Sequence, residues 1–424
     1  MLPSWLLFLT SATYVALLFG IAFYGDRRAR RLGKPVRKHW VYALGLGVYC
    51  TSWTFYGAAG RAATSGWDFL PIYLGPALLF VFGYTMLRRI VAISKRHNIT
   101  SIADFIGARY GRHQKLAMLV TLIAVFGVLP YIALQIKAVA FSFDVLVGPA
   151  PAGRADGNAL LISFLLALFA ILFGTRHVLS TENHHGMMLA IAFESICKLL
   201  AFIAVGLYAC YGLFDGIGDA YAQALALPQV SESLQQADWQ LGFATQTLLA
   251  GAAALCLPRQ FHVTVVENAG TADLRTARWM FPLYLGLISV LVMPIMAAGV
   301  HYLPSPTPTD AYVLALPLSQ GHPWLALIAY LGGFSAGTSM VIVSSVALST
   351  MICNEVAMPL LLSWQRLGLA GRTDLSRIVK TIRRATIVAL LMLAYLYYRL
   401  FTGPGSLASI GLLSFSAVLH FLPA

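Results

Sequence analysis

The stretch LGLGVYCTSWTFYGAAG, residues 44–60, is typical of a membrane-spanning helix that is interrupted near its middle. It contains four glycines, Gly45, Gly47, Gly57 and Gly60, and the polar residues Cys50, Thr51, Ser52 and Thr54. Glycine and hydroxyl residues let a helix unwind, and unwound backbone at membrane depth is tolerated only where protein or water covers it. The sequence therefore predicts a discontinuous helix whose main-chain carbonyls turn toward a cavity.

The composition of the chain indicates a helical protein that crosses a membrane many times. Of its 424 residues, 59% are hydrophobic and only 11% are charged, and the mean hydropathy is +0.75. A span needs about 20 apolar residues to cross the hydrocarbon layer. By that rule we expect about eleven spans, at 3–24, 39–60, 67–91, 115–141, 158–175, 186–214, 240–258, 278–302, 323–352, 382–400 and 405–422.

The positions of the basic residues predict the orientation of these spans. With the N-terminus outside, 24 of the 29 Lys and Arg fall in loops on the cytoplasmic side, among them Arg259 just after the seventh span. Such an excess marks the cytoplasmic face of a membrane protein. We therefore expect a bacterial inner-membrane protein with its C-terminus in the cytoplasm. The net charge of +13 then reflects topology and not nucleic-acid binding.

A second interrupted span follows five spans after the first. The segment LLAGAAALCLPRQ (248–260) has Gly251 in its middle and Pro258 near its inner end. Two five-helix repeats of opposite topology, each led by a broken helix, form a known transporter architecture. We expect these repeats at 39–214 and 240–424, preceded at 1–38 by an extra helix and a basic loop, with the last helix cut short. The alternative is that the glycines serve only close helix packing.

A run of hydroxyl residues marks another span. The segment GFSAGTSMVIVSSVALST (333–350) carries Ser335, Thr338, Ser339, Ser344, Ser345, Ser349 and Thr350. Such hydroxyls often bond back to a carbonyl of their own helix. Two adjacent hydroxyls that face the carbonyls of an unwound helix would instead form an oxygen cage for a small cation such as Na⁺. The residues alone leave both interpretations open.

The chain resembles the sodium:solute symporter family, in particular the transporter-like modules that precede bacterial sensor histidine kinases. The resemblance lies in YCTSWTFYGAAG (49–60), KRHNITSIADFIGARYG (95–111), LPYIALQIKAVAFSF (129–143), GTRHVLSTENHHGMMLAIAFES (174–195), LPRQFHVTVVENAGTADLRTARWMFPLYL (257–285) and LASIGLLSFSAV (407–418). It implies an all-α, LeuT-like core of two inverted five-helix repeats. The blocks at 257–285 point to the kinase-linked branch.

The resemblance also implies a cation site. In the family, carbonyls of the first core helix and hydroxyls of the eighth hold sodium. Carried over to this sequence, the ligands are the carbonyls of Gly47, Cys50 and Ser335 and the hydroxyls of Thr338 and Ser339. Where proline-transporting members have an aspartate, this sequence has Tyr49. That departure leaves sodium coupling, proton coupling and no coupling open.

Aromatic and amide side chains near the two breaks are candidates for contact with a solute. Trp53 and Tyr56 follow the first break, Tyr131 and Gln135 are four residues apart on one helix face, and Gly251 lies in the seventh span. Aromatic rings and an amide suit a small polar solute with some apolar body. Ordinary packing of the two aromatics after the break is the alternative.

Two lysines lie inside predicted spans, where a charged side chain normally has a partner. Glu194 and Lys198 are four residues apart, so we expect them to form an ion pair on one helix. Lys137 either extends outward toward Asp144 or places its ammonium in the central cavity, to bind a carboxylate or to replace a bound cation.

We therefore expect a secondary transporter for a small solute, an amino acid or another organic acid, driven by Na⁺ or H⁺ and embedded in a lipid bilayer. The alternative is the solute-sensing module of a two-component histidine kinase that signals to a response regulator. No catalytic motif occurs in the chain, so we expect no enzyme, and no cofactor beyond a bound Na⁺. The chain ends at FLPA (421–424), so a fragment of a longer sensor kinase also stays open.

Overall fold

The computed structural model of the chain describes residues 2–32, 38–148, 165, 168, 170–172, 185–234, 239–363, 375–401, 414–416 and 421. Within these residues every regular element is a helix, and none is a strand. The predicted all-α class is confirmed.

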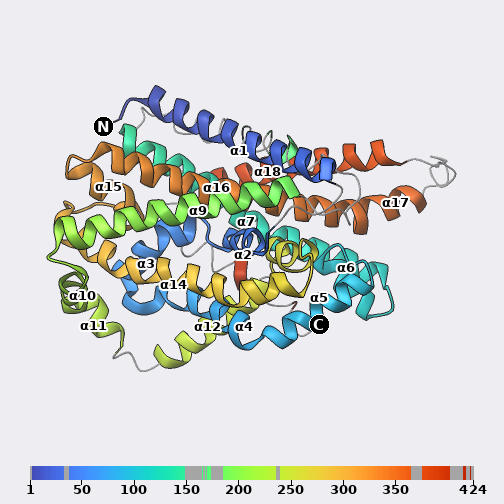
Figure 1. Cartoon of the computed structure of the whole chain (residues 1–424), viewed down its shortest axis with the longest axis horizontal. Helices are drawn as coiled ribbons and strands as arrows, with labels where there is room; N and C mark the ends of the chain where they lie inside the picture. Colours follow the sequence, from blue (N-terminus) through green and yellow to red (C-terminus); the bar gives the residue numbers. More distant parts are fainter. Residues whose placement is uncertain are drawn as a thin grey trace.

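Six long helices run along the molecule: α1 (Ser4–Leu32), α7 (Gln114–Val147), α9 (His185–Tyr208), α14 (Thr271–Tyr302), α16 (Pro323–Met351) and α18 (Ser376–Phe401). Five of the spans that contain them, all but that of α18, are long and apolar enough to cross a membrane, at 26 to 41 residues each. Helix α9 packs against α1, α14 and α16 (Figure 1).

Two further spans are bent pairs. Trp53–Phe69 and Pro71–Phe82 meet at 58°, and Trp239–Cys256 and Pro258–Val266 meet at 56°. If each pair is one span, the described part of the chain has up to seven by length and composition. The prediction of eleven spans and of repeats at 39–214 and 240–424 stays a prediction, since most of 158–175 and 405–422 lies outside the described residues.

Both predicted helix breaks are confirmed. Helix α2 (His39–Gly45) continues as the 3-10 helix η1 (Leu46–Tyr49), and Cys50 is then extended with ψ 102°. The chain resumes as the π-helix η2 (Trp53–Gly57), followed by α3 (Ala58–Ser65), η3 (Gly66–Phe69) and α4 (Pro71–Phe82). In the seventh span, Leu257, with ψ 129°, separates α12 (Trp239–Cys256) from α13 (Pro258–Phe261) and the π-helix η5 (His262–Val266).

Shorter elements occupy the two ends of the molecule and the connections. They are α5 (Tyr84–Arg96), α6 (Ile102–Arg109), η4 (Ala209–Leu213), α10 (Ile217–Ala226), α11 (Pro228–Ser233), η6 (Thr309–Ala311), α15 (Tyr312–Ser319), η7 (Ile352–Ala357) and α17 (Met358–Ser363). Figure 1 shows α10 and α11 at one end of the long helices, and α6 toward the other.

Helix α16 forms the centre of the fold. Every residue from Gly332 to Met351 is buried, and the helix packs against α7, α9 and α18. The broken segments η1 and α13 also contact it. The hydroxyl-rich segment therefore faces other parts of the protein, where polar groups find partners, and not lipid.

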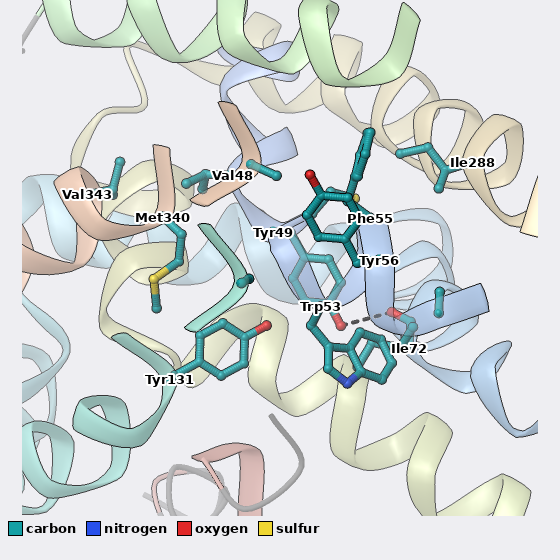
Figure 2. Packing of buried hydrophobic residues seen from close by; sticks show 14 of the residues in the cluster. Val48, Tyr49, Trp53, Phe55, Tyr56, Ile72, Tyr131, Ile288, Met340 and Val343 are labelled. Carbon is teal, nitrogen blue, oxygen red and sulfur yellow. Dashed lines mark hydrogen bonds between the residues drawn. The ribbon is translucent and has the colours of Figure 1, made fainter. Parts of the chain in front are cut away.

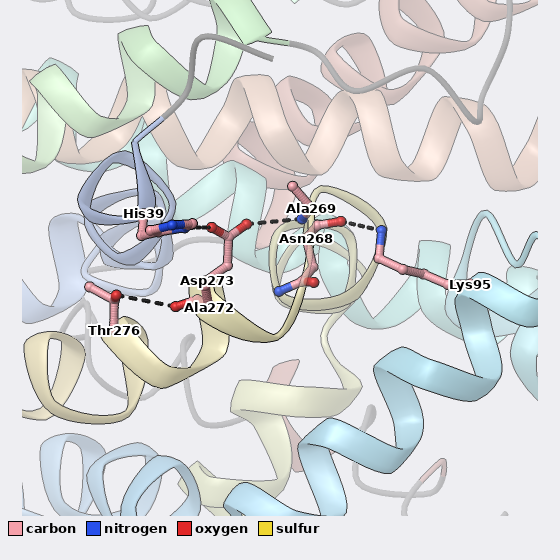
Figure 3. A network of polar contacts seen from close by, with 7 residues as sticks. All are labelled: His39, Lys95, Asn268, Ala269, Ala272, Asp273 and Thr276. Atoms are coloured by element: carbon pink, nitrogen blue, oxygen red, sulfur yellow. Dashed lines mark hydrogen bonds and ion pairs between the residues drawn. The ribbon is translucent and has the colours of Figure 1, made fainter. Parts of the chain in front are cut away.

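A polar network fixes the loop between η5 and α14 (Figure 3). The Asp273 carboxylate accepts from the backbone N–H of Ala269 at 2.9 Å and contacts His39 Nδ1, at the start of α2, at 2.7 Å. Lys95, near the end of α5, donates to the carbonyl of Asn268. The second broken segment is thereby tied to the start of the first and to α5.

Close packing of α4 on α12 depends on Gly75. A Cβ at this position would lie 2.3 Å from the carbonyl oxygen of Thr247 and 2.6 Å from the nitrogen of Gly251. Because both atoms belong to backbone, Gly75→Ala must push the helices apart, and we expect a loss of about 1–3 kcal/mol in the free energy of unfolding. Thermal melting of the purified protein in detergent measures this loss.

The matched control is Gly242→Ala on α12, where a Cβ meets nothing within 4 Å. Alanine favours a helix over glycine by up to about 1 kcal/mol, so this variant should melt at or above the wild-type temperature. Equal melting temperatures for the two variants would contradict the packing argument.

Candidate functional site

The amine of Lys198 joins three elements in the centre of the molecule. Lys198 lies on α9 and is only 1% exposed. Its Nζ donates to the carbonyl oxygens of Gly47 at 2.7 Å and Cys50 at 2.8 Å, and lies 3.5 Å from Ser339 Oγ on α16. A lysine ammonium has three donors and no acceptor, so these three oxygens match its donors in number.

The helix break makes this contact possible. The backbone leaves helical geometry at Cys50, which turns carbonyl oxygens away from the helix axis and toward α9. Gly47 allows the close approach of α9, because a Cβ there would lie 2.6 Å from Ser195 Oγ. Hydrogen bonds to a charged donor contribute about 1.5–3 kcal/mol each, so the amine holds the unwound segment firmly against α9.

Glu194 accepts hydrogen bonds from α16 and not from Lys198. Thr338 Oγ1 donates to Glu194 Oε1 at 2.6 Å, and Ser335 Oγ donates to the Glu194 carbonyl at 2.9 Å. The expected ion pair between Glu194 and Lys198 on one helix is therefore wrong in its geometry. The two side chains interact electrostatically, but tertiary partners at the break and on α16 take the hydrogen bonds of each.

The structure brings the five predicted cation ligands together around these two side chains. Gly47, Cys50 and Ser339 surround Lys198 Nζ, whereas the hydroxyls of Ser335 and Thr338 bond to Glu194. The Ser335 carbonyl accepts from the Thr338 hydroxyl at 3.2 Å. The prediction did not anticipate that a lysine side chain would occupy the centre of this group.

Tyr131 and Gln135 on α7 hold the same break from its other side (Figure 2 shows Tyr131 beside Trp53). The Tyr131 hydroxyl bonds to Thr51 Oγ1 at 2.8 Å, and Gln135 Oε1 accepts from the backbone N–H of Ser52 at 3.1 Å. The backbone N–H of Trp53 also donates to Thr51 Oγ1, at 3.3 Å. The predicted Tyr131–Gln135 face therefore positions the first two residues after Cys50.

The other predicted solute residues lie apart from this group or pack elsewhere. Tyr56 lies against Gly333 on α16, where a Cβ would meet its ring and hydroxyl. Gly251 packs on Gly75, and a Cβ at position 251 would lie 3.2 Å from the Gly75 carbonyl oxygen, so a small residue is favoured there. Lys137 is half-buried and is attracted electrostatically to Asp310. The structure thus gives Lys137 an acidic partner on η6.

Arg259, on α13 directly after the second break, is buried to 1% exposure. The predicted loop position is therefore wrong, since Arg259 lies in a buried helix, and its side of the membrane stays a prediction. Its guanidinium carbon lies 4.5 Å from the centre of the Tyr131 ring. The Tyr131 hydroxyl interacts with it electrostatically, yet none of its three nitrogens makes a hydrogen bond of ordinary geometry. Its place within the segment LPRQ, after a helix-ending proline, suggested a loop.

Aromatic side chains pack around Tyr131 on the side that faces the Arg61–Asp68 ion pair. Phe415 stacks on Tyr131 with ring centres 5.7 Å apart and lies 6.4 Å from Tyr49. Phe415 and Trp53 line a hollow of about 10 Å³ beside the Arg61–Asp68 ion pair, whose N–O distance is 3.0 Å. A volume of this size holds at most one water molecule. The Tyr49 hydroxyl donates to the Ile72 carbonyl at 2.8 Å.

Comparison with known proteins supports a symporter. No family model matches the chain. The uncharacterized symporter YhjB of Bacillus subtilis (strain 168) is 22% identical over 402 residues, which cover 91% of this chain and 74% of that protein. The uncharacterized symporter YodF of the same organism is 26% identical over 290 residues, 66% of this chain and 53% of that protein.

A solved structure shares the fold. The substrate-bound, outward-open state of a Na⁺-coupled sialic acid symporter matches 96% of this chain and 82% of its own, with a TM-score of 0.68 at 13% identity. At this identity the likeness shows the fold alone. The relatives and the fold together support a membrane secondary transporter, and the resemblance to sensor kinases finds no support in them.

The bond from Ser335 to Glu194 can be tested against a matched serine on the same helix. Ser335 and Ser345 are both fully buried, but only Ser335 has a hydrogen-bond partner. We expect Ser335→Ala to lower the free energy of unfolding by about 0.5–1.5 kcal/mol, because it removes a satisfied hydrogen bond.

Ser345→Ala removes a buried hydroxyl without a partner, so it should leave stability unchanged or raise it. Chemical denaturation in detergent compares the two variants. A Ser345→Ala loss as large as that of Ser335→Ala would show that the α16–α9 bond is not what stabilises this part of the helix.

Proposed function

We propose that this chain is a secondary transporter of a small solute, an amino acid or another organic acid, in which the Lys198 amine takes the place of a coupling sodium ion. The observation that supports this most directly is the bonding of Lys198 Nζ to the carbonyls of Gly47 and Cys50. These are the carbonyls that the family resemblance assigns to Na⁺. The proposed coupling ion is the proton.

Sodium and the ammonium group compete for one place. The carbonyl oxygens that would replace the hydration shell of Na⁺ already accept from Lys198 at 2.7 and 2.8 Å. A second cation about 4 Å away would be repelled by about 4 kcal/mol at an effective dielectric constant of about 20. With Lys198 protonated and in place, the site therefore has neither free oxygens nor a favourable potential for Na⁺.

Protonation of one atom then acts as the bound ion does in a sodium-coupled transporter. The charged amine bridges the break after η1 to α16 through Ser339. A neutral amine keeps two donors and gains a lone pair, which cannot bond to a carbonyl oxygen. Loss of the proton from Nζ therefore weakens the connection between the broken helix and α16, so that these elements move relative to each other.

The proposal places the protein in the inner membrane of a bacterium, with the N-terminus outside and the C-terminus in the cytoplasm. The distribution of Lys and Arg in the sequence supports this orientation. The bilayer, the solute and the proton are its partners in this account.

Replacement of Lys198 by alanine should create a sodium site that the wild type lacks. We expect wild-type protein to melt at the same temperature in NaCl and in KCl of equal ionic strength. Lys198→Ala frees the Gly47 and Cys50 carbonyls and the Ser339 hydroxyl, so NaCl should raise its melting temperature. A ligand at about 100 times its Kd stabilises a protein by about 2.7 kcal/mol.

Lys198→Met is the control, because its side chain keeps the volume without the charge and should stay insensitive to Na⁺. In sodium-free proteoliposomes with an imposed pH gradient, wild-type protein should accumulate a member of a labelled amino-acid and organic-acid panel. Lys198→Met should lose accumulation and retain solute exchange. Stabilisation of the wild type by Na⁺ over K⁺, or uptake that requires Na⁺, would contradict the proposal.

A further inference from the structure

We propose that the guanidinium of Arg259 binds the carboxylate of the transported solute. This inference rests on the proposed transport function and adds a binding residue and a chemical class of ligand to it. Arg259 lies on α13, at the second helix break, and Lys198 at the first. Each of the two breaks therefore has one buried cation beside it.

The buried charge of Arg259 has no counter-ion in the described part of the chain. Its Nε and both terminal nitrogens are buried without hydrogen-bond partners. The neighbouring Gln260 is fully buried too, and neither atom of its amide has a partner. Buried polar atoms are nearly always satisfied, so two adjacent side chains with unpartnered polar atoms beside a helix break are suited to bind a polar ligand.

The contact with Tyr131 does not compensate for the burial of the charge. A cation–π contact contributes about 0.5–2 kcal/mol, whereas removal of an ion from water costs several kcal/mol in a protein. The hydroxyls of Tyr131 and Tyr49, which both interact with Arg259, bond to Thr51 and to the Ile72 carbonyl. An anionic ligand would supply the interaction energy that these contacts do not provide to the buried guanidinium.

The charges in this part of the core favour a carboxylate. Lys198 interacts electrostatically with Arg259 and with Glu194, and Glu194 is bonded to Thr338. Two cations thus share one carboxyl group, and an additional negative charge would offset the excess positive charge of the group when Lys198 is protonated. A guanidinium presents a planar pair of donors that matches a carboxylate in bidentate geometry.

The surroundings indicate what the rest of the solute contacts. Arg259 lies over the face of Tyr131, and Phe415 stacks against the same ring. Trp53, whose indole N–H is buried without a partner, lines a hollow together with Phe415. A carboxylate at Arg259 would thus place the body of the solute against aromatic rings. It would also offset the repulsion between Arg259 and Lys198, which links solute binding to the proton site.

The stability of Arg259→Gln without solute distinguishes a ligand anchor from a structural arginine. Removal of a buried charge without a counter-ion relieves its desolvation cost, so this variant should melt at or above the wild-type temperature. A structural arginine predicts the opposite, with a melting temperature several degrees lower and restored by Arg259→Lys. That second result would overturn the proposal.

Solute binding supplies the direct test. Tryptophan fluorescence of the purified protein is titrated with potassium salts of short-chain, hydroxy and aromatic monocarboxylic acids, with free amino acids, and with the neutral amides of the same acids. We expect at least one acid to bind and its amide to bind at least about 100-fold more weakly, because the amide leaves the guanidinium unpaired. Arg259→Gln should lose the affinity for the acid to a similar extent, and Arg259→Lys should retain part of it.

Arg278→Gln is the matched control, since Arg278 stacks on Tyr84 and Trp279 and donates to the Val81 carbonyl outside the site. Its affinity should equal that of the wild type. Equal binding of acid and amide, unchanged affinity in Arg259→Gln, or no binding by any acid of the panel would overturn the proposal. Binding that depends on Arg259, without proton-driven uptake, would leave the carboxylate site standing and refute the transport function instead.

Discussion

The hydrogen bonds from the Lys198 amine to the carbonyls of Gly47 and Cys50 are the interaction on which the centre of this structure depends. An unwound helix in a membrane needs partners for its free backbone groups, and a buried ammonium needs acceptors. The ammonium and the carbonyls of the unwound segment therefore supply each other's hydrogen-bond partners. Because the amine also approaches Ser339, one side chain connects α9, the broken helix and α16.

The hydroxyl groups of α16 follow from the same constraint. The Thr338 hydroxyl donates to the Glu194 carboxyl group and the Ser335 hydroxyl donates to the Glu194 carbonyl, so α16 supplies the donors that Lys198 does not give to Glu194. Other hydroxyls of the helix, such as that of Ser349, bond back to their own backbone. Some hydroxyls of α16 therefore bond to another helix and others bond to the backbone of α16 itself. Only the half of the helix near Ser339 takes part in the site. Arg259 places a second cation beside the second break, where it contacts the Tyr131 ring but has no carboxylate partner in the described part of the chain.

Much of this arrangement could be predicted from local sequence. Glycines and hydroxyls around Cys50 located the first break, and Pro258 located the second, because both patterns act on the backbone of a few residues. The destination of Lys198 could not be found in this way. The i, i+4 spacing from Glu194 predicts a pair on one helix. In the structure, the Lys198 amine donates instead to the carbonyls of Gly47 and Cys50, about 150 residues away in sequence. Arg259 was misplaced because a proline and a charge together resemble the end of a span, and only the tertiary fold buries them.

Proton movement coupled to solute tests the central claim most directly. Proteoliposomes without sodium are loaded with a fluorescent pH indicator, and a carboxylate that binds the purified protein is added outside. The account predicts acidification of the interior with wild-type protein and none with Lys198→Met. A solute that enters without acidification, together with uptake of radioactive sodium, would contradict it, because the Lys198 amine could then not be standing in the place of the coupling ion.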